Sequence, residues 1–405
     1  MILRHRSMQL LIMFSLCLAA LMPASAASPA YRTGITRWRA AANQFSAWQI
    51  SGVSRTAAGA LQLNPATASS GTDPYAPGAY NGHNFYNGGS FIVGEAVSPI
   101  VAPSFGFFEA IASWNATTPD GSWIETQIRA QTGGRWTKWY NLGVWASGTT
   151  TVERHSVNGQ GDADGYVAVD TLVLSAKKTA ATAFQLKLRL FSADGAALPS
   201  VQNASVAYST TAVKPKTLTP GNPANWNRLL NVPECSQMVY PDGGEVWCSP
   251  TSTSMVLGYW SQDTGPCEPR VRAAVAGVYD WLYDGHGNWP FNTAYAATQG
   301  YEGYVTRFTS LSQVEAWIAA GVPVIVSYSW KNDLTGAPFG SSGGHLAVIV
   351  GFDAAGNPII NDPAWGSDPE VQHTYLRSEF ESLWLEHSGG TVYLIYPAGH
   401  ATPSL

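Results

Sequence analysis

The stretch EVWCSPTSTSMVLGYW, residues 245–260, places a single cysteine where a helix is expected to begin. Pro250 suits the first helical turn. The apolar residues that follow recur at helical spacing: Met255, Val256, Tyr259 and Trp260. A thiol at this position lies at the positive end of the helix dipole, which favours the reactive thiolate. Three interpretations of Cys248 are open at this point: it is half of a disulfide, a buried packing residue or a nucleophile.

The N-terminal residues indicate the compartment and bear on the choice among these three readings. Basic residues precede the apolar run LLIMFSLCLAALM, and the small residues PASAAS follow it. This is the pattern of a secretory signal peptide, residues 1–26, and it predicts a secreted or periplasmic protein. The apolar run is too short for a membrane anchor.

The cysteine count then narrows the disulfide question. The chain has four cysteines, and Cys17 lies within the predicted signal. Cys235, Cys248 and Cys267 remain, and an odd number in an exported protein leaves one thiol free or bridging chains. A disulfide between Cys235 and Cys267 would join both flanks of the Cys248 segment and leave Cys248 free. Pairing of Cys248 itself stays open on these grounds.

Length, charge and composition set the domain organisation and exclude some partners. The chain of 405 residues carries a formal charge of -5, with both signs scattered, so no basic footprint for nucleic acid or anionic lipid is present. The length suggests about two domains. The proline-rich stretch VKPKTLTPGNPANWNR, residues 213–228, is typical of a linker or an extended entry strand. We expect a β-rich accessory domain over 30–212 and a second domain over 229–400.

Residues 30–212 have the pattern of short antiparallel strands. FQLKLRL, residues 184–190, alternates apolar with polar side chains, and GQGDADG and SADGAA supply turns. We expect a β-sandwich or jelly roll. Crowded aromatics suggest a buried core more than a sugar-stacking face: Trp136, Trp139, Tyr140 and Trp145. Asp162 and Asp164 lack the rest of a calcium loop, so a turn is the better reading.

Residues 229–400 mix helices with strands, which predicts an α+β domain. CEPRVRAAVAGVYDWLYD, residues 267–284, shows a helical apolar stripe that extends through Trp281 and Leu282. Ser312 and Glu315 form the pattern of a capping box for a helix that runs to Ala320. VPVIVSY is a predicted strand, and HLAVIVGF, DAAGN and PIIND predict a two-stranded hairpin.

His345 and Asp362 are the candidate base and its orienting acid. His345 opens the first hairpin strand after GSSGG, and Asp362 closes the second. A hairpin brings these two ends together, so the carboxylate can hold the imidazole in one tautomer. A slip of one residue in register would separate the two side chains.

These residues together resemble a known family. VPECSQMVYPDGGEVWCSPTS, residues 232–252, followed by GGHLAVIVGFDAAGNPIINDPA, residues 343–364, is similar to the C39-like branch of the papain-like cysteine peptidases. The resemblance covers roughly residues 229–397. It implies a papain-like fold with Cys248 as nucleophile, His345 as base, Asp362 as orienting acid and Gln237 in the oxyanion hole. Ser249 departs from the glycine that is usual in the family.

The expected activity is that of an exported cysteine peptidase that needs no cofactor and no metal. Cys, His and Asp side chains can also bind zinc, but no second Cys or His stands at ligand spacing, so the sequence does not favour a zinc site. The expected partner is a peptide or protein substrate, with a possible glycan or cell-surface ligand of the N-terminal domain. An amidase, a transglutaminase-like acyltransferase and a non-catalytic surface-binding protein remain as alternatives.

Overall fold

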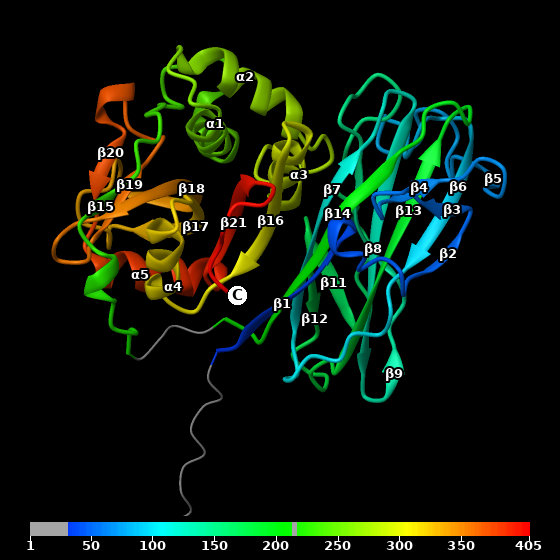
Figure 1. Ribbon diagram of the computed structural model, residues 1–405, viewed down its shortest axis with the longest axis horizontal. Coiled ribbons are helices and arrows are strands. Elements are labelled where there is room, and N and C mark those ends of the chain that lie inside the picture. The colour runs from blue at the N-terminus through cyan, green and yellow to red at the C-terminus, as the bar shows by residue number, and fades with distance from the viewer. Residues whose placement is uncertain (1–30, 213–216) are drawn as a thin grey trace, which may run out of the picture. The chain divides into compact units, whose positions relative to one another are not determined.

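The computed structural model describes residues 31–212 and 217–405. The predicted signal peptide, residues 1–26, and part of the predicted linker, residues 213–216, lie outside the described residues. Residues 31–405 pack as one compact unit. The chain enters with strands and finishes with an α+β region (Figure 1).

Residues 33–209 form two antiparallel sheets that face each other (Figure 1). The strands of the first sheet, in spatial order, are β11 (Gly165–Ala168), β12 (Thr171–Leu174), β7 (Glu109–Thr117), β14 (Ser200–Ser209), β4 (Leu61–Leu63) and β3 (Val53–Arg55), with β1 (Thr33–Arg39) also on β14. The second sheet has β10 (Tyr140–Trp145), β8 (Ser122–Thr132), β13 (Ala183–Ser192), β6 (Ser90–Val97) and β2 (Gln49–Ser51), with β5 (Ser69–Thr72) on β6 and β9 (Arg135–Trp136) on β8. The predicted β-sandwich-like region is confirmed.

The alternation of apolar and polar side chains along residues 184–190 predicts which of them form the core between the two sheets. Its apolar members are all fully buried: Phe184, Leu186, Leu188 and Leu190. Lys187 and Arg189 between them are half-buried. Of the crowded aromatics, Tyr140 and Trp145 are in the core, whereas Trp136 and Trp139 lie half-buried against the Arg129 guanidinium.

Residues 228–397 form a third antiparallel sheet with helices on both faces (Figure 1). The strands, in spatial order, are β16 (Tyr301–Arg307), β21 (Thr391–Pro397), β17 (Val324–Lys331), β18 (Ser341–Phe352), β19 (Pro358–Asn361) and β20 (Gln372–Thr374), with β15 (Arg228–Leu229) on β18. The helices are α1 (Cys248–Ser261), α2 (Cys267–Val278), α3 (Trp289–Thr298), α4 (Leu311–Ala319) and α5 (Arg377–Ser388). Alternate residues of β17 and β18 point to opposite faces, so one face packs on α4 and α5 and the other on α1.

Two details of the predicted helices are wrong. The helix that begins at Cys267 ends at Val278, and Trp281 packs with the aromatic residues of the β-sandwich instead of continuing the helical stripe. The capping box is also absent, because Ser310 is the N-cap residue and Ser312 donates to the Pro220 carbonyl. Glu315 is buried and pairs with Arg377 at 2.6 Å.

The first sheet and β16 are joined by buried polar contacts between side chains and backbone. Asn115 Nδ2 donates to the Gly303 carbonyl at 2.7 Å, and the Val305 N–H donates to Ser113 Oγ at 2.9 Å. Arg307 of β16 forms an ion pair with Glu109 of β7. Residues far apart in sequence therefore share one largely buried interface.

Candidate active site

Cys248 is the first residue of α1, as the sequence predicts, and it is a half-exposed free thiol among the described cysteines. Cys235 and Cys267 are joined by a disulfide, with Cα atoms 5.7 Å apart. Hydroxyl groups of α1 fix the helix against the sheet. Ser252 Oγ donates to the Leu346 carbonyl at 3.1 Å, directly beside His345 in sequence.

His345 and Asp362 come together through the predicted hairpin. β18 and β19 pair antiparallel, with Val348 opposite Asn361, and a bulge near Gly351 adjusts the register. His345 Nε2 lies 2.7 Å from Asp362 Oδ1, and both side chains are buried. The Cys248 side chain also acts on the imidazole, whose pKa it raises. Since Asp362 occupies Nε2, the nitrogen that remains for Cys248 is Nδ1.

Asp362 is fully buried, but its carboxylate oxygens accept several hydrogen bonds. Oδ2 accepts hydrogen bonds from the hydroxyls of Tyr328 at 2.9 Å and Tyr375 at 2.7 Å, and Oδ1 accepts from the Ala364 N–H at 3.0 Å. Burial alone would raise the pKa of Asp362, but the charge of His345 and these hydrogen bonds lower it below its ordinary value. The carboxylate is thereby held ionised and fixed in orientation.

His345 is held in a form that carries a proton. Burial lowers its pKa, whereas the Asp362 carboxylate and then the Cys248 side chain raise it, and the net direction is upward. The ring also lies edge-on to Tyr328 at 5.4 Å and to Trp330 at 5.5 Å. These contacts fix the imidazole plane beside the Asp362 carboxylate.

Gln237 is buried beside this arrangement, in the segment before α1. Its backbone N–H donates to the Pro363 carbonyl at 2.8 Å, next to Asp362. Its Nε2 donates to the Gly244 carbonyl at 2.7 Å, which uses one of the two amide hydrogens. The Oε1 atom is buried and has no hydrogen-bond partner.

Ser249, which departs from the family's usual glycine, has a defined partner. Its hydroxyl lies 2.9 Å from the Tyr393 hydroxyl on β21, and both side chains are buried. The serine side chain thus fits between α1 and the sheet, and it adds a contact that a glycine lacks.

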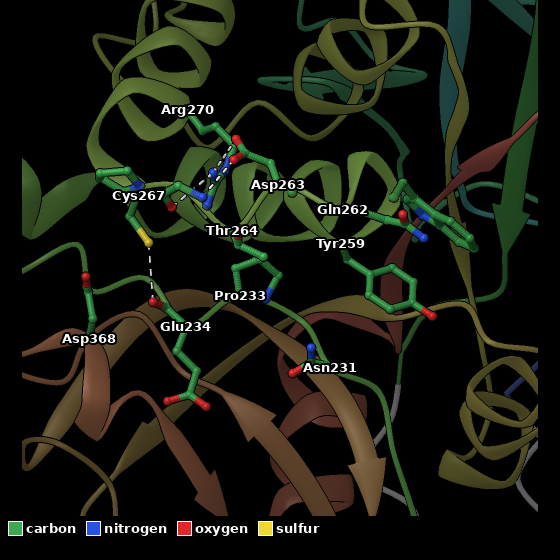
Figure 2. Close-up of a pocket in the computed structure, with 14 residues that line it drawn as sticks. Asn231, Pro233, Glu234, Tyr259, Gln262, Asp263, Thr264, Cys267, Arg270 and Asp368 are labelled. Carbon is green, nitrogen blue, oxygen red and sulfur yellow. Dashed lines mark hydrogen bonds and ion pairs between the residues drawn. The ribbon is translucent and has the colours of Figure 1, made fainter.

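A large cavity lies away from these residues. Its volume is about 740 Å³, and Figure 2 shows it beside the end of α1 and the disulfide residue Cys267. Charged residues on its walls include Glu234, Arg270 and Asp368, and Arg270 is paired with Asp263. None of the four predicted catalytic residues lines it. The candidate active site is therefore defined by its side-chain geometry and not by cavity size.

Sequence reasoning missed the residues that surround the Cys248–His345–Asp362 arrangement. Tyr328 ends the predicted strand VPVIVSY, but alternation gave no sign that its hydroxyl reaches Asp362. Tyr375 and Trp330 carried no signal either, because their contacts depend on the tertiary fold. Asp162 and Asp164 serve in turns, as predicted: Asp162 accepts from the Tyr140 hydroxyl, and Asp164 pairs with Arg135.

Within residues 31–212 and 217–405, no cluster of three or more His, Cys, Asp or Glu side chains is arranged to hold a metal ion. In the same described ranges no helix has the length and apolar character needed to cross a membrane.

Cysteine hydrolases use a thiol together with an imidazole that is hydrogen-bonded to a carboxylate. Residues 229–392 match the family model described as the Peptidase_C39 like family, and residues 34–209 match the Peptidase C39 N-terminal domain. Each part of the chain thus has its own match: the C-terminal part is similar to a C39-like peptidase domain, and the first half is similar to a C39 N-terminal domain.

A search of curated protein sequences found no match. Among solved structures, TmCBM61 in complex with β-1,4-galactotriose has a TM-score of 0.22 and 9% identity, over 42% of this chain and 92% of that one. The CBM22-1–GH10 modules of Clostridium thermocellum endo-1,4-β-D-xylanase 10B, complexed with xylohexaose, have a TM-score of 0.18 and 12% identity, over 45% of this chain and 30% of that one. Similarities this weak carry no argument about fold or ligand.

Proposed function

We propose that the protein is an exported, papain-like cysteine peptidase that cleaves peptide bonds through a thioester intermediate. The observation that carries the proposal is the 2.7 Å contact between His345 Nε2 and Asp362 Oδ1, which leaves Nδ1 of the same imidazole for Cys248. A cysteine at a helix start, a buried base and a buried carboxylate together support an activated nucleophile. The signal sequence and the disulfide support export.

The chemistry follows from these positions. Cys248 first transfers its proton to His345 Nδ1, which gives the protonated imidazole that the raised pKa of His345 favours. The sulfur then forms a bond to the substrate carbonyl carbon. The carbonyl oxygen becomes an oxyanion that the Cys248 backbone N–H and the free amide hydrogen of Gln237 stabilise; N–H groups in the first helical turn have no intrahelical acceptor. His345 then gives its proton to the leaving amine as the carbon–nitrogen bond breaks.

Hydrolysis of the thioester completes the cycle. His345 accepts a proton from water, the hydroxide oxygen bonds to the acyl carbon, and the carbon–sulfur bond breaks to return Cys248. Asp362 stays ionised throughout and holds the imidazole in orientation. If an amine replaces water at this step, the same residues perform acyl transfer, so the acceptor separates a peptidase from a transferase.

The test is hydrolysis of a mixed peptide library by the full exported chain. We expect the wild type to release new amino termini and Cys248→Ala to release none above background. Ser261→Ala, an exposed position at the far end of the same helix, is the matched control and should retain wild-type hydrolysis. Equal hydrolysis by Cys248→Ala and wild type would overturn the proposal. New amide products formed only with added amine would reassign the protein to the acyltransferases.

A further inference from the structure

The connection between α2 and α3, residues 279–288, contacts both the β-sandwich and the residue next to Cys248. On one side the Trp281 ring stacks on His83 at 4.0 Å and lies 5.2 Å from the His155 ring. On the other side the His286 ring lies 6.1 Å from Trp247, which directly precedes Cys248. One short segment therefore links the N-terminal domain to the candidate active site.

The conformation of this connection is fixed by one buried carboxylate. Asp280 Oδ1 accepts N–H groups from Leu282 and Tyr283, both at 3.2 Å, and Oδ2 accepts from Asn288 Nδ2 at 3.0 Å. The same Oδ1 accepts the Ser156 N–H of the β-sandwich at 3.0 Å. The turn is therefore closed by its own backbone and by a donor from the other domain.

Two more side chains of the β-sandwich hold the helices that flank the connection. Arg154 donates to the Ala276 carbonyl of α2 at 2.8 Å. Asp170 accepts the Trp289 N–H at the start of α3 at 2.7 Å. Both side chains are buried, so these contacts are made without competition from water.

Tyr283 is a large exposed side chain of this scaffold, three residues before His286, whose ring contacts Trp247. Its side chain is 47% exposed. Exposed apolar side chains also precede Cys248 in the chain: Met238, Val239 and Val246. Large apolar side chains left in water near a reactive group are typical of a binding surface.

We propose that residues 279–288 form one wall of the substrate-binding cleft, in which Tyr283 contacts an apolar side chain of the peptide. Trp281 is a positioning residue that acts through its contacts with the β-sandwich. The inference rests on the proposed function, and it adds that the N-terminal domain sets peptide affinity by holding this wall in place.

The test compares two reagents on the full chain. Iodoacetamide alkylates a thiol without needing a peptide site, whereas a peptidyl chloromethyl ketone with leucine or phenylalanine next to the reactive carbon must first bind. In both reactions the Cys248 sulfur forms a carbon–sulfur bond and a halide ion leaves. We expect Tyr283→Ala and Trp281→Ala to slow ketone inactivation by about tenfold or more, the scale of a lost apolar contact. The iodoacetamide rate should change by less than about twofold.

Two controls separate a lost contact from a lost fold. Tyr166→Ala removes another tyrosine that is 51% exposed, on β11, and should leave both rates unchanged. Trp281→Phe keeps an aromatic ring and should retain most of the wild-type ketone rate. If Tyr283→Ala is inactivated by the ketone as fast as the wild type, this inference is overturned but the proposed function is not. Failure of both reagents to modify wild-type Cys248 contradicts the proposed function, and the inference with it.

Discussion

Asp362 accepts four hydrogen bonds while it is fully buried, so its charge and its orientation are both fixed. Asp362→Asn preserves the size of the side chain but removes the charge that holds the His345 imidazole. We expect kcat to fall by about 100-fold to 10,000-fold with little change in KM, as when an orienting carboxylate is neutralised in a hydrolytic triad. Steady-state kinetics on a cleavable peptide measure both constants.

Asp353→Asn is the matched control for this change. Asp353 accepts the N–H groups of Ala355 and Asn357 in the turn of the same hairpin, at the end away from His345. The kcat of the Asp353→Asn variant should stay within about twofold of the wild-type value. An equal loss in both variants would assign the effect to the hairpin and not to the carboxylate.

The His345–Asp362 pair also predicts how stability depends on pH. The pKa of His345 is raised above 6.5, so its contribution is fully present below pH 6.5 and is lost as the pH rises through the folded-state pKa. The pKa of Asp362 is lowered below 3.8, so its contribution is present above pH 3.8 and is lost as the pH falls through the folded-state pKa. The free energy of unfolding of the wild type should exceed that of His345→Gln by the largest amount between about pH 3.8 and pH 6.5. Denaturant titrations at several pH values measure this difference. A difference that is independent of pH would contradict this.

At the scale of the element, α1 is held by hydroxyl contacts and by a disulfide beside it. Ser249→Ala leaves the Tyr393 hydroxyl buried without its partner, which costs about 1–3 kcal/mol. The double variant with Tyr393→Phe should recover part of that loss, because both polar groups are then absent. Urea unfolding of the four proteins measures the coupling; strictly additive losses would show that the hydroxyls do not interact.

The Cys235–Cys267 disulfide joins the segment before α1 to the start of α2 across a sequence separation of 32 residues. A loop of this length predicts a stabilisation of about 3–4 kcal/mol, mainly through the unfolded state. Replacing both cysteines with alanine should lower the free energy of unfolding by that amount while Cys248 still reacts with iodoacetamide. Loss of Cys248 labelling in the folded variant would show that the disulfide also shapes the site.

The elements also show where sequence patterns suffice. The hairpin that carries His345 and Asp362 was predictable, because an apolar run, a polar turn and a second apolar run fix its ends. The end of α2 was not, because the stripe of residues 267–282 continues in sequence while Trp281 leaves it for the aromatic side chains of the β-sandwich. Glu315 likewise matches a capping box, yet it is buried with Arg377 and with Trp226, which donates at 2.6 Å. Local sequence patterns do not show contacts between residues that are far apart in the sequence.

At the scale of the whole molecule, Asp170 is a buried carboxyl of the β-sandwich that binds the start of α3. Burial raises its pKa to about 6, the Asp280 charge adds to this, and Arg307 opposes it. Between about pH 4 and pH 6 the unfolded chain therefore loses this proton before the folded chain does, so stability falls as the pH rises.

Asp170→Asn removes this titration and keeps a side-chain oxygen as acceptor. The stability of wild type relative to the variant should fall by up to about 3 kcal/mol as the pH rises from about 4 to about 7, since each pKa unit is worth about 1.4 kcal/mol. Denaturant unfolding at several pH values measures the difference. The same difference at every pH would mean that Asp170 does not titrate in this range.

The most direct measurement for the central claim is the location of the acyl group during turnover. Rapid acid quench of the wild type with a cleavable peptide, followed by peptide mapping by mass spectrometry, should find the acyl mass on Cys248 alone, and no such adduct in Cys248→Ala. Peptide cleavage by wild type with the acyl group on another residue, or cleavage that persists in Cys248→Ala, would contradict the account.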